Sequence, residues 1–366
     1  MQVSKLSLSN FRNHKALNLT FLPGTTTIVG PNGRGKTNIV EAVHYLATLS
    51  SHRVSQDGPL IRSGLTTANV AATVIKHDRQ AQVDLTINYP GVNKVILNGA
   101  TLTKPKDILG LINTVIFSPE DLDLIKGEPT TRRRFIDEFS TSLSPKFVNT
   151  RSEYERTLKQ RNTLLKSLGR RNPTESARAT LEAWNEQLVT HGSDLVSTRL
   201  QNLQKLKSHI LNFGNIISGD SEPLFVNYAS SWLPNEPISI TDIANEFRTQ
   251  LEKRFKDEVE RGVTLVGPHR DDLEILLSNM PAKGYASHGQ SWSIAIALRL
   301  SIFTALRIHD DDPILILDDV FAELDEKRRS RLIEVVSGVE QTLITAAVLE
   351  DVPKVLLSNQ LLLDDN

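Results

Sequence analysis

The stretch "TTTIVGPNGRGKTNIVEAV", residues 25–43, decides the fold of this chain. Its first residues are β-branched and end at a glycine, which predicts a strand. Its last residues place Ile39 and Val43 at helical spacing, which predicts a helix that begins near Lys36. The residues between strand and helix fit the pattern G-x-x-x-x-G-K-[ST] and are Gly30, Pro31, Asn32, Gly33, Arg34, Gly35, Lys36 and Thr37.

This pattern predicts a phosphate-binding loop. Glycines let backbone N–H groups curl around phosphate oxygens, and the helix that follows offers its N-terminal dipole to the same anion. In such a loop Lys36 reaches the β- and γ-phosphates in a catalytic role, and the Thr37 hydroxyl ligates Mg²⁺. The alternative is a glycine-rich turn that binds nothing. The flanking strand and helix favour the nucleotide.

A second motif, "ILILDDVFAELD" at residues 314–325, is an apolar run that ends in acids. Such a run is typical of a strand buried on both faces, and it delivers Asp318 to the strand end where open α/β sheets bind ligands. We expect Asp318 to bind Mg²⁺ directly or through the ligands of the ion, and Asp319 to orient or deprotonate the attacking water. The alternative is an aspartate pair in a turn. The order of the two motifs favours the nucleotide site.

A third motif, "YASHGQSWSIAIALRLSIFTAL" at residues 285–306, opens a long apolar helix with a Ser-x-Gly-Gln turn. Ser287, the backbone at Gly289 and Gln290 are placed to hydrogen-bond a phosphate at this helix N-terminus. One nucleotide does not need two such caps from one subunit, so we expect the turn to close over the nucleotide of a partner chain. The alternative is an N-cap serine followed by a glycine turn.

Composition limits the class of protein. The 366 residues allow two or three domains, and 42 Lys+Arg against 43 Asp+Glu give a net charge of -1, so any nucleic-acid surface must be a local patch. The absence of cysteine excludes disulfides, a thiol nucleophile and a cysteine-based zinc site. The start "MQVSKLSLSN" lacks the apolar core of a signal peptide, and no run approaches the roughly 20 apolar residues of a membrane span. We expect a cytoplasmic protein.

Three segments predict an α/β fold with a helical insertion. Residues 1–115 contain short strand patterns around one helix, and strand–helix alternation returns over residues 262–366. Residues 116–261 between them predict helices, with a helical hairpin that turns at residues 169–173. We expect the outer segments to form one sheet-based domain.

In order, spacing and sequence, the motifs resemble the ABC-type P-loop ATPase heads of the SMC-like DNA-repair family, most closely its RecF branch. The resemblance extends to three further stretches: "LSNFRNHKALNLTF" (8–21), "VIFSPEDLDLIKGEPTTRRRFID" (115–137) and "TLVGPHRDDL" (264–273). It covers essentially the whole chain. The helical insertion is far too short for the long arms of SMC proteins, which agrees with the RecF branch.

The resemblance implies further site residues. Arg12 would approach the phosphates, with a surface arginine as the alternative. Glu120 and Asp121 would lie in a loop that links the nucleotide to the helical lobe; an N-cap with acidic first-turn residues is the alternative. His269 and Arg270 would lie near the site, and without the resemblance they would be a turn at a strand end.

The same resemblance implies one residue at a dimer interface, and the sequence departs from the pattern of related ATPases at two places. Asp325 is similar to an acidic loop residue that crosses the dimer interface. Asp319 is one carbon shorter than the glutamate usual at this place in related ATPases, which implies weak hydrolysis. The stretch "TLITAAV" (342–348) has no histidine after the last core strand, and whether Thr345 senses the γ-phosphate instead stays open.

Two basic segments are candidates for DNA binding. One is the triplet Arg132, Arg133 and Arg134. The other is the stretch 151–171, where seven Lys/Arg (151, 156, 159, 161, 166, 170 and 171) stand against two Glu (153 and 155). Such a patch predicts salt-dependent contact with phosphates. A solvated helix face is the alternative. Because aromatic residues are few, we expect contact with the backbone of a duplex or a duplex–single-strand junction rather than base stacking.

Together these features favour an ATP-dependent homodimer that clamps gapped or single-stranded DNA in recombinational repair and replication restart, with weak ATP hydrolysis as its switch. The resemblance implies RecO- and RecR-type partners and, indirectly, RecA. A nucleotide-binding subunit of an ABC transporter is the first alternative, and it predicts a compact helical subdomain with an apolar groove. A DNA-binding protein insensitive to ATP is the second.

Overall fold

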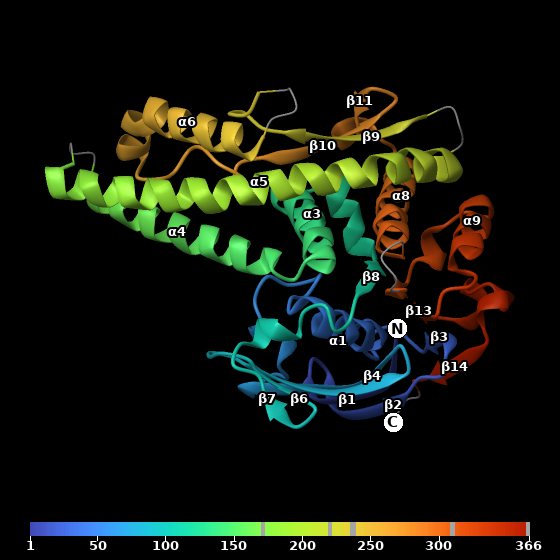
Figure 1. Cartoon of the computed structure of the whole chain (residues 1–366). Helices are drawn as coiled ribbons and strands as arrows, with labels where there is room; N and C mark the ends of the chain where they lie inside the picture. Colours follow the sequence, from blue (N-terminus) through green and yellow to red (C-terminus); the bar gives the residue numbers. More distant parts are fainter. Residues whose placement is uncertain (170–172, 219–221, 235–238, 308–311, 364–366) are drawn as a thin grey trace. The chain divides into compact units, whose positions relative to one another are not determined.

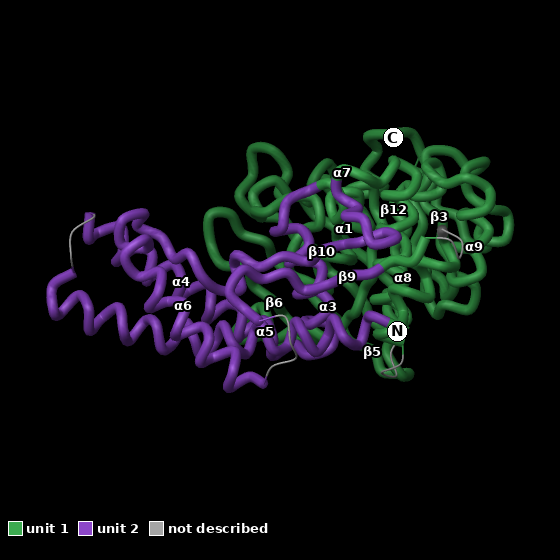
Figure 2. The backbone as a smooth tube through the Cα atoms, turned by 90° about the horizontal axis from the view of Figure 1, so that it is seen from above, with its two compact units in different colours: residues 1–126, 208–224, 284–366 green, residues 127–207, 225–283 purple. Residues whose placement is uncertain are grey.

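The computed structural model describes residues 1–169, 173–218, 222–234, 239–307 and 312–363. The chain folds into two compact units (Figure 2): unit 1 holds residues 1–126, 208–224 and 284–366, and unit 2 holds residues 127–207 and 225–283. These limits differ from the expected boundaries at 115/116 and 261/262. Residues 116–126 and 208–224 belong to unit 1, and residues 262–283, which include two strands of a small sheet, belong to unit 2. A compact unit is not itself a functional domain, so the division into ATPase and helical lobes stays a prediction.

Unit 1 contains an antiparallel sheet in the order β2-β1-β4-β5-β6-β7. Its strands are β1 (Gln2–Phe11), β2 (His14–Thr20), β4 (Thr67–Lys76), β5 (Arg79–Asn88), β6 (Lys94–Leu97) and β7 (Ala100–Thr101). Along β4, buried residues alternate with partly exposed ones, so one face of the sheet packs on the core. The short strand patterns predicted within residues 1–115 are confirmed.

A parallel sheet with the order β14-β3-β13-β12-β8 completes unit 1. Its strands are β3 (Gly24–Val29), β8 (Thr114–Phe117), β12 (Ile314–Asp318), β13 (Gln341–Ala346) and β14 (Asn359–Leu362). Every residue of β12 and β13 is buried, as their continuous apolar sequences predict. Strands from both ends of the chain therefore share one sheet.

The helix α1 (Lys36–Thr48) begins at the predicted residue and is buried almost all round. Its apolar side chains share one core with the antiparallel sheet and with β3, β12 and β13 of the parallel sheet. Unit 1 also contains α2 (Asp123–Lys126), α8 (His288–Arg307) and α9 (Glu326–Val336). In the described part of the chain, none of the helices combines the length and apolar character that a membrane crossing requires.

Unit 2 is mainly helical (Figure 1). Its helices are α3 (Pro129–Leu143), α4 (Phe147–Ser167), the first part of α5 (Glu175–Ser218) and α6 (Ile240–Arg261). The two helices of the predicted hairpin are confirmed by α4 and α5, whose apolar faces pack with α6, and residues 170–172 of its expected turn lie outside the described residues. A small sheet of β9 (Leu224–Ala229), β10 (Asp272–Leu277) and β11 (Met280–Pro281) was not predicted. The short helix α7 (Ala282–Tyr285) leads back to unit 1.

Candidate functional site

The glycine-rich loop joins the end of β3 to the start of α1. Gly33 and Gly35 have φ of 83° and 92°, in the left-handed region where a side chain is strained. A Cβ on Gly35 would also lie 2.4 Å from His14 Nε2 and 2.5 Å from Asn13 Oδ1. The glycine at 35 is therefore required both by the backbone and by the turn between β1 and β2.

Lys36 is buried inside this loop. Its Nζ donates to the carbonyl oxygens of Gly30 at 2.6 Å and Pro31 at 3.1 Å, and it lies 3.4 Å from Asn32 Oδ1. Burial lowers the pKa of the amine, and the nearby carboxylates of Asp319 and Asp318 oppose that shift. The loop thus holds a cation at its centre, bonded to groups that a phosphate can replace.

Asp318 lies at the end of β12 and is 2% exposed. Its Oδ1 accepts hydrogen bonds from Thr37 Oγ1 at 3.0 Å and from Thr345 Oγ1 at 2.6 Å. Burial raises the pKa of this carboxyl group to about 6, although both hydrogen bonds act in the opposite direction. The two motifs therefore meet as predicted, with a hydroxyl and a carboxylate side by side.

These oxygens fit Mg²⁺, which prefers carboxylate and hydroxyl oxygens together with nucleotide phosphates. In the described residues, no cluster of three or more histidine, aspartate or glutamate side chains offers a metal site of its own. Thr37 and Asp318 would hold the ion only in part, and the phosphates would supply further ligands.

Asp319 has φ of 55°, which is uncommon for a residue with a side chain. Its backbone N–H donates to Thr345 Oγ1 at 3.0 Å and lies 3.3 Å from the Thr345 carbonyl oxygen. Its charge is the stronger of the two carboxylate effects on Lys36. The aspartate is thus held in an unusual backbone conformation near the lysine of the loop.

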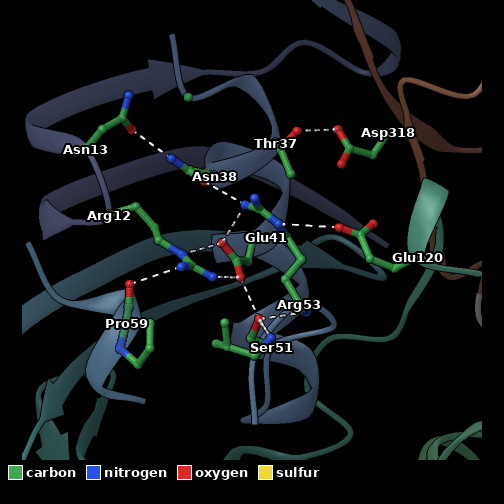
Figure 3. A network of polar contacts seen from close by, with 12 residues as sticks. Arg12, Asn13, Thr37, Asn38, Glu41, Ser51, Arg53, Pro59, Glu120 and Asp318 are labelled. Carbon is green, nitrogen blue, oxygen red and sulfur yellow. Dashed lines mark hydrogen bonds and ion pairs between the residues drawn. The ribbon is translucent and has the colours of Figure 1, made fainter. Parts of the chain in front are cut away.

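Arg12 is bound to a buried acid of α1 (Figure 3). Its Nε and Nη2 donate to the two oxygens of Glu41 at 2.8 and 2.6 Å, and Glu41 is fully buried. Ser51 Oγ donates to the same carboxylate at 2.5 Å, and Arg53 lies 3.6 Å from it. This geometry gives Arg12 a firm structural role and leaves its expected approach to phosphates as a prediction.

Four residues beside the loop were not predicted as site residues: Asn13, His14, Asn38 and Arg53. Asn13 Nδ2 donates to the Gly33 carbonyl at 3.3 Å, and His14 Nε2 lies 3.1 Å from the Gly35 carbonyl. A shallow pocket of about 560 Å³ is lined in part by Asn13, Asn38 and Arg53. Isolated polar residues carry no spacing signal, so only the fold identifies them.

Glu120 and Asp121 have different surroundings in the short 3₁₀ helix Pro119–Leu122. Arg53 Nε lies 3.5 Å from Glu120 Oε1, and the Glu120 charge adds to the raised pKa of Asp318. Asp121 completes a capping box with Ser118 and accepts two hydrogen bonds from Arg299 of α8 at 2.9 and 2.6 Å. The capping geometry considered as an alternative is therefore present.

The Ser-x-Gly-Gln turn also forms a capping box. Gln290 N–H donates to Ser287 Oγ at 3.2 Å, and Ser287 N–H donates to Gln290 Oε1 at 2.9 Å. Gln290 Nε2 donates to Glu222 Oε1 at 2.8 Å. Asp325 caps α9 by accepting from Arg328 N–H. These contacts describe one chain, and the phosphate of a partner chain stays a prediction.

His269 and Arg270 belong to unit 2. His269 Nδ1 lies 2.7 Å from the Tyr154 hydroxyl, and both His269 Nε2 and Arg270 Nη2 lie 3.3 Å from the Thr264 carbonyl. Burial lowers the pKa of His269 to about 4, so the ring is neutral at neutral pH. They form a turn before β10.

The prediction of two basic segments that face DNA is wrong for some of their arginines. Arg132 is 6% exposed and pairs with Asp272 at 2.7 Å, and Arg161 is fully buried and pairs with Glu258 at 2.6 Å. Both guanidinium groups are buried and paired with an acid of the same unit, so they are not available to contact DNA. Lys159 and Lys166 of α4 are exposed.

The other arginines of the two basic segments either contact groups of the protein or lie outside the described residues. Arg133 donates to the Asp271 carbonyl oxygen at 2.6 Å, and Arg134 pairs with Glu138. Arg151 and Arg156 pair with the glutamates of their own helix. Arg170 and Arg171 lie outside the described residues. The exposed positive charge of the predicted patch is therefore smaller than the sequence count.

Comparison with known proteins gives consistent results. The chain matches the family described as RecF/RecN/SMC N terminal domain over residues 2–354. It is 47% identical to the DNA replication and repair protein RecF of Streptomyces avermitilis, with 97% of this chain and 96% of the relative covered. It is 45% identical to the protein of the same name from Frankia alni, with 96% and 95% covered.

Solved structures of RecF and of Smc head domains are similar to this chain. A structure of the recombination mediator protein RecF with ATP is similar, with a TM-score of 0.89, 31% identity, and 96% of this chain and 93% of that chain covered. An Smc head domain derived from Pyrococcus furiosus has a TM-score of 0.52 at 18% identity, covers 94% of this chain and 89% of its own, and shows the fold alone. The predicted fold class, an ABC-type ATPase head with an inserted helical lobe, is confirmed.

Proposed function

This chain belongs to the RecF/RecN/SMC family and within it to the RecF group of DNA replication and repair proteins, and we propose that it is an ATP-switched clamp on DNA. The observation that carries the proposal is the meeting of Lys36, Thr37 and Asp318 at one loop. Unit 1 would be the ATPase head and unit 2 the helical lobe. Its work on DNA would place the protein in the cytoplasm.

ATP is the nucleotide that we propose for this loop, and the similar RecF structure with ATP supports it. Backbone N–H groups of residues 30–35 would bind the phosphates, and Lys36 would exchange its carbonyl partners for phosphate oxygens. Thr37 and Asp318 would hold Mg²⁺. Asn13, Asn38 and Arg53 line the adjoining pocket, which is polar enough to receive the rest of the nucleotide.

The clamp requires two copies of the chain. The turn Ser287–Gln290 of one copy would close on the γ-phosphate held by the other, and the two-fold arrangement would align both helical lobes on DNA. Asp319, held near Lys36, would orient the attacking water for slow hydrolysis, and loss of the γ-phosphate would open the dimer. We further propose that the clamp binds DNA at gaps or junctions. It would act with RecO- and RecR-type partners to load RecA.

The curated relatives favour this proposal over a transporter subunit, because the compared relatives are DNA replication and repair proteins. A DNA-binding protein insensitive to ATP is the remaining competitor. It predicts DNA binding that does not respond to changes in the loop.

The test is light scattering of the full chain with and without ATP and gapped DNA. We expect a dimer only with ATP, and loss of dimerisation and of ATP-dependent DNA binding in both Lys36→Met and Ser287→Arg. Ser337→Arg, at an exposed serine after α9, is the matched control and should behave as wild type. Dimerisation by both site variants would reject the clamp, and equal DNA binding by Lys36→Met would favour the ATP-insensitive competitor.

A further inference from the structure

The side chain of Gln290 is fixed at both ends. Its Oε1 accepts from Ser287 N–H at 2.9 Å, and its Nε2 donates to Glu222 Oε1 at 2.8 Å. An amide has one oxygen and one NH₂ group, so these two contacts define which way the group faces. Glu222 therefore sets the orientation of a side chain in the turn that the proposed function assigns to a partner's phosphate.

Glu222 lies close to a place where the chain passes between the units. The chain crosses at 126/127, 207/208, 224/225 and 283/284. Glu222 precedes the third crossing by two residues, and Ser287 follows the fourth by three. At the first crossing, Lys126 Nζ lies 3.3 Å from His288 Nδ1, inside the turn. Three of the four crossings thus lie beside the Ser287–Gln290 turn in sequence or by direct contact.

Beyond these crossings the chain continues into secondary structure or hydrogen-bonded segments of unit 2. Leu224 begins β9, which pairs with β10 in the small sheet. Lys283 Nζ donates to the Gly127 carbonyl at 3.0 Å, so the first and fourth crossings are also joined within unit 2. A displacement at the turn therefore has short routes along the chain into the second unit.

We propose that Glu222 is a positioning residue for the Ser287–Gln290 turn, and that its hydrogen bond to Gln290 transmits the nucleotide state of the turn to unit 2. The inference rests on the proposed function, because it needs a phosphate to reach the turn. It adds a residue outside the nucleotide motifs and a defined route to β9.

The chemistry of the contact gives the direction of the change. The Glu222 carboxylate accepts from one of the two amide N–H donors of Gln290. A phosphate that arrives at the same turn repels the carboxylate, because both carry negative charge. Binding of the phosphate should therefore release Glu222 and shift the segment that leads into β9.

The test uses hydrogen exchange of β9 amides in the full chain, with and without a non-hydrolysable ATP analogue. Fluorescent ATP binding to each variant checks the loop separately. In wild type we expect the analogue to change β9 exchange by about fivefold or more, a coupling of ordinary size. Glu222→Ala should keep ATP affinity but lose most of that response. Glu222→Gln keeps an oxygen acceptor for Gln290 but carries no charge to repel the phosphate, so its response should be smaller than that of wild type.

Glu334→Ala, at an exposed glutamate of α9, is the matched control and should respond as wild type. A β9 response in Glu222→Ala equal to that of wild type would overturn the inference, and so would a wild-type protein that dimerises with ATP without any change at β9. Failure of wild type to bind ATP, or to dimerise with it in light scattering, would instead reject the proposed function, and with it this inference. The two failures are therefore distinguishable.

Discussion

The hydroxyl of Thr345 donates a hydrogen bond of 2.6 Å to the Asp318 carboxylate. The hydroxyl oxygen of Thr345 also accepts a hydrogen bond from the Asp319 backbone N–H at 3.0 Å. The parallel register of β12 and β13 places Asp318 opposite Thr345, so one buried side chain holds both acids of the motif. This contact gives Thr345 a positioning role, whether or not it also senses the γ-phosphate.

Thr345→Val should lower ATP turnover about tenfold or more while changing ATP affinity little, because the acids lose their alignment but the phosphate loop is intact. Loss of the buried hydrogen bonds should also cost about 1 kcal/mol of unfolding free energy. Steady-state ATPase assays and nucleotide titration measure the two effects. Thr345→Ser keeps the hydroxyl and should restore turnover. Equal turnover in the valine and serine variants would contradict the positioning role.

The pKa of Asp318 predicts opposite effects on stability and on ligand binding. Burial raises this pKa to about 6 from an ordinary 3.8, so the folded chain binds the proton more tightly than the unfolded chain. The carboxylate therefore opposes folding above pH 6 by up to about 3 kcal/mol, and this penalty disappears as pH falls toward 4. Mg²⁺ needs the ionised form, so Mg²⁺-dependent ATP affinity should fall as pH drops through about 6.

Asp318→Asn separates these effects. The amide oxygen can still accept from Thr37 and Thr345, but the group carries no charge. Without nucleotide at pH 7.5, we expect a higher melting temperature than wild type, and Mg²⁺ should no longer strengthen ATP binding. Thermal denaturation and titration with and without Mg²⁺ are the measurements. A variant less stable than wild type would show that the buried charge is well compensated.

Particular residues show how far sequence reasoning reached. The meeting of Thr37 and Asp318 was predictable because each lies at a fixed place in a strand–loop pattern. The role of Thr345 was not predictable, because it depends on which strand neighbours β12 and in which register. The basic patch failed for a related reason: the partner of Arg161 is Glu258, which lies 97 residues away in sequence. Charge counts do not show which charges face each other inside the fold.

Glu41→Gln tests the buried network beside the loop. Glu41 accepts hydrogen bonds from Arg12 and Ser51, so loss of its charge leaves the Arg12 guanidinium poorly compensated, whereas Arg53 keeps its contact with Glu120. Breaking a buried ion pair in this way costs about 3–5 kcal/mol. Thermal denaturation should show a clear fall in melting temperature. Glu334→Gln, at an exposed position, should show none, and equal melting temperatures for the two variants would argue that water stabilises the Glu41 site.

The corrected basic surface makes a prediction about DNA. Lys159 and Lys166 are the exposed lysines of α4, whereas Arg161 between them is buried against Glu258. If α4 contacts the DNA backbone, Lys159→Ala with Lys166→Ala should weaken binding and reduce its dependence on salt, because two phosphate contacts are lost. Lys94→Ala with Lys354→Ala removes the same charge from exposed lysines of unit 1 and is the matched control.

Arg161→Met should act differently from the lysine pair. It leaves the Glu258 carboxylate buried without its cation, so we expect a loss of about 3–5 kcal/mol in stability. At a temperature where the variant is folded, the salt dependence of DNA binding should match that of wild type, because Arg161 reaches no phosphate. Binding isotherms of gapped DNA across a range of salt concentrations, with circular dichroism to confirm folding, distinguish the two variants. A salt dependence unchanged in the lysine pair would exclude α4 as the DNA surface and direct attention to other basic residues of the lobe.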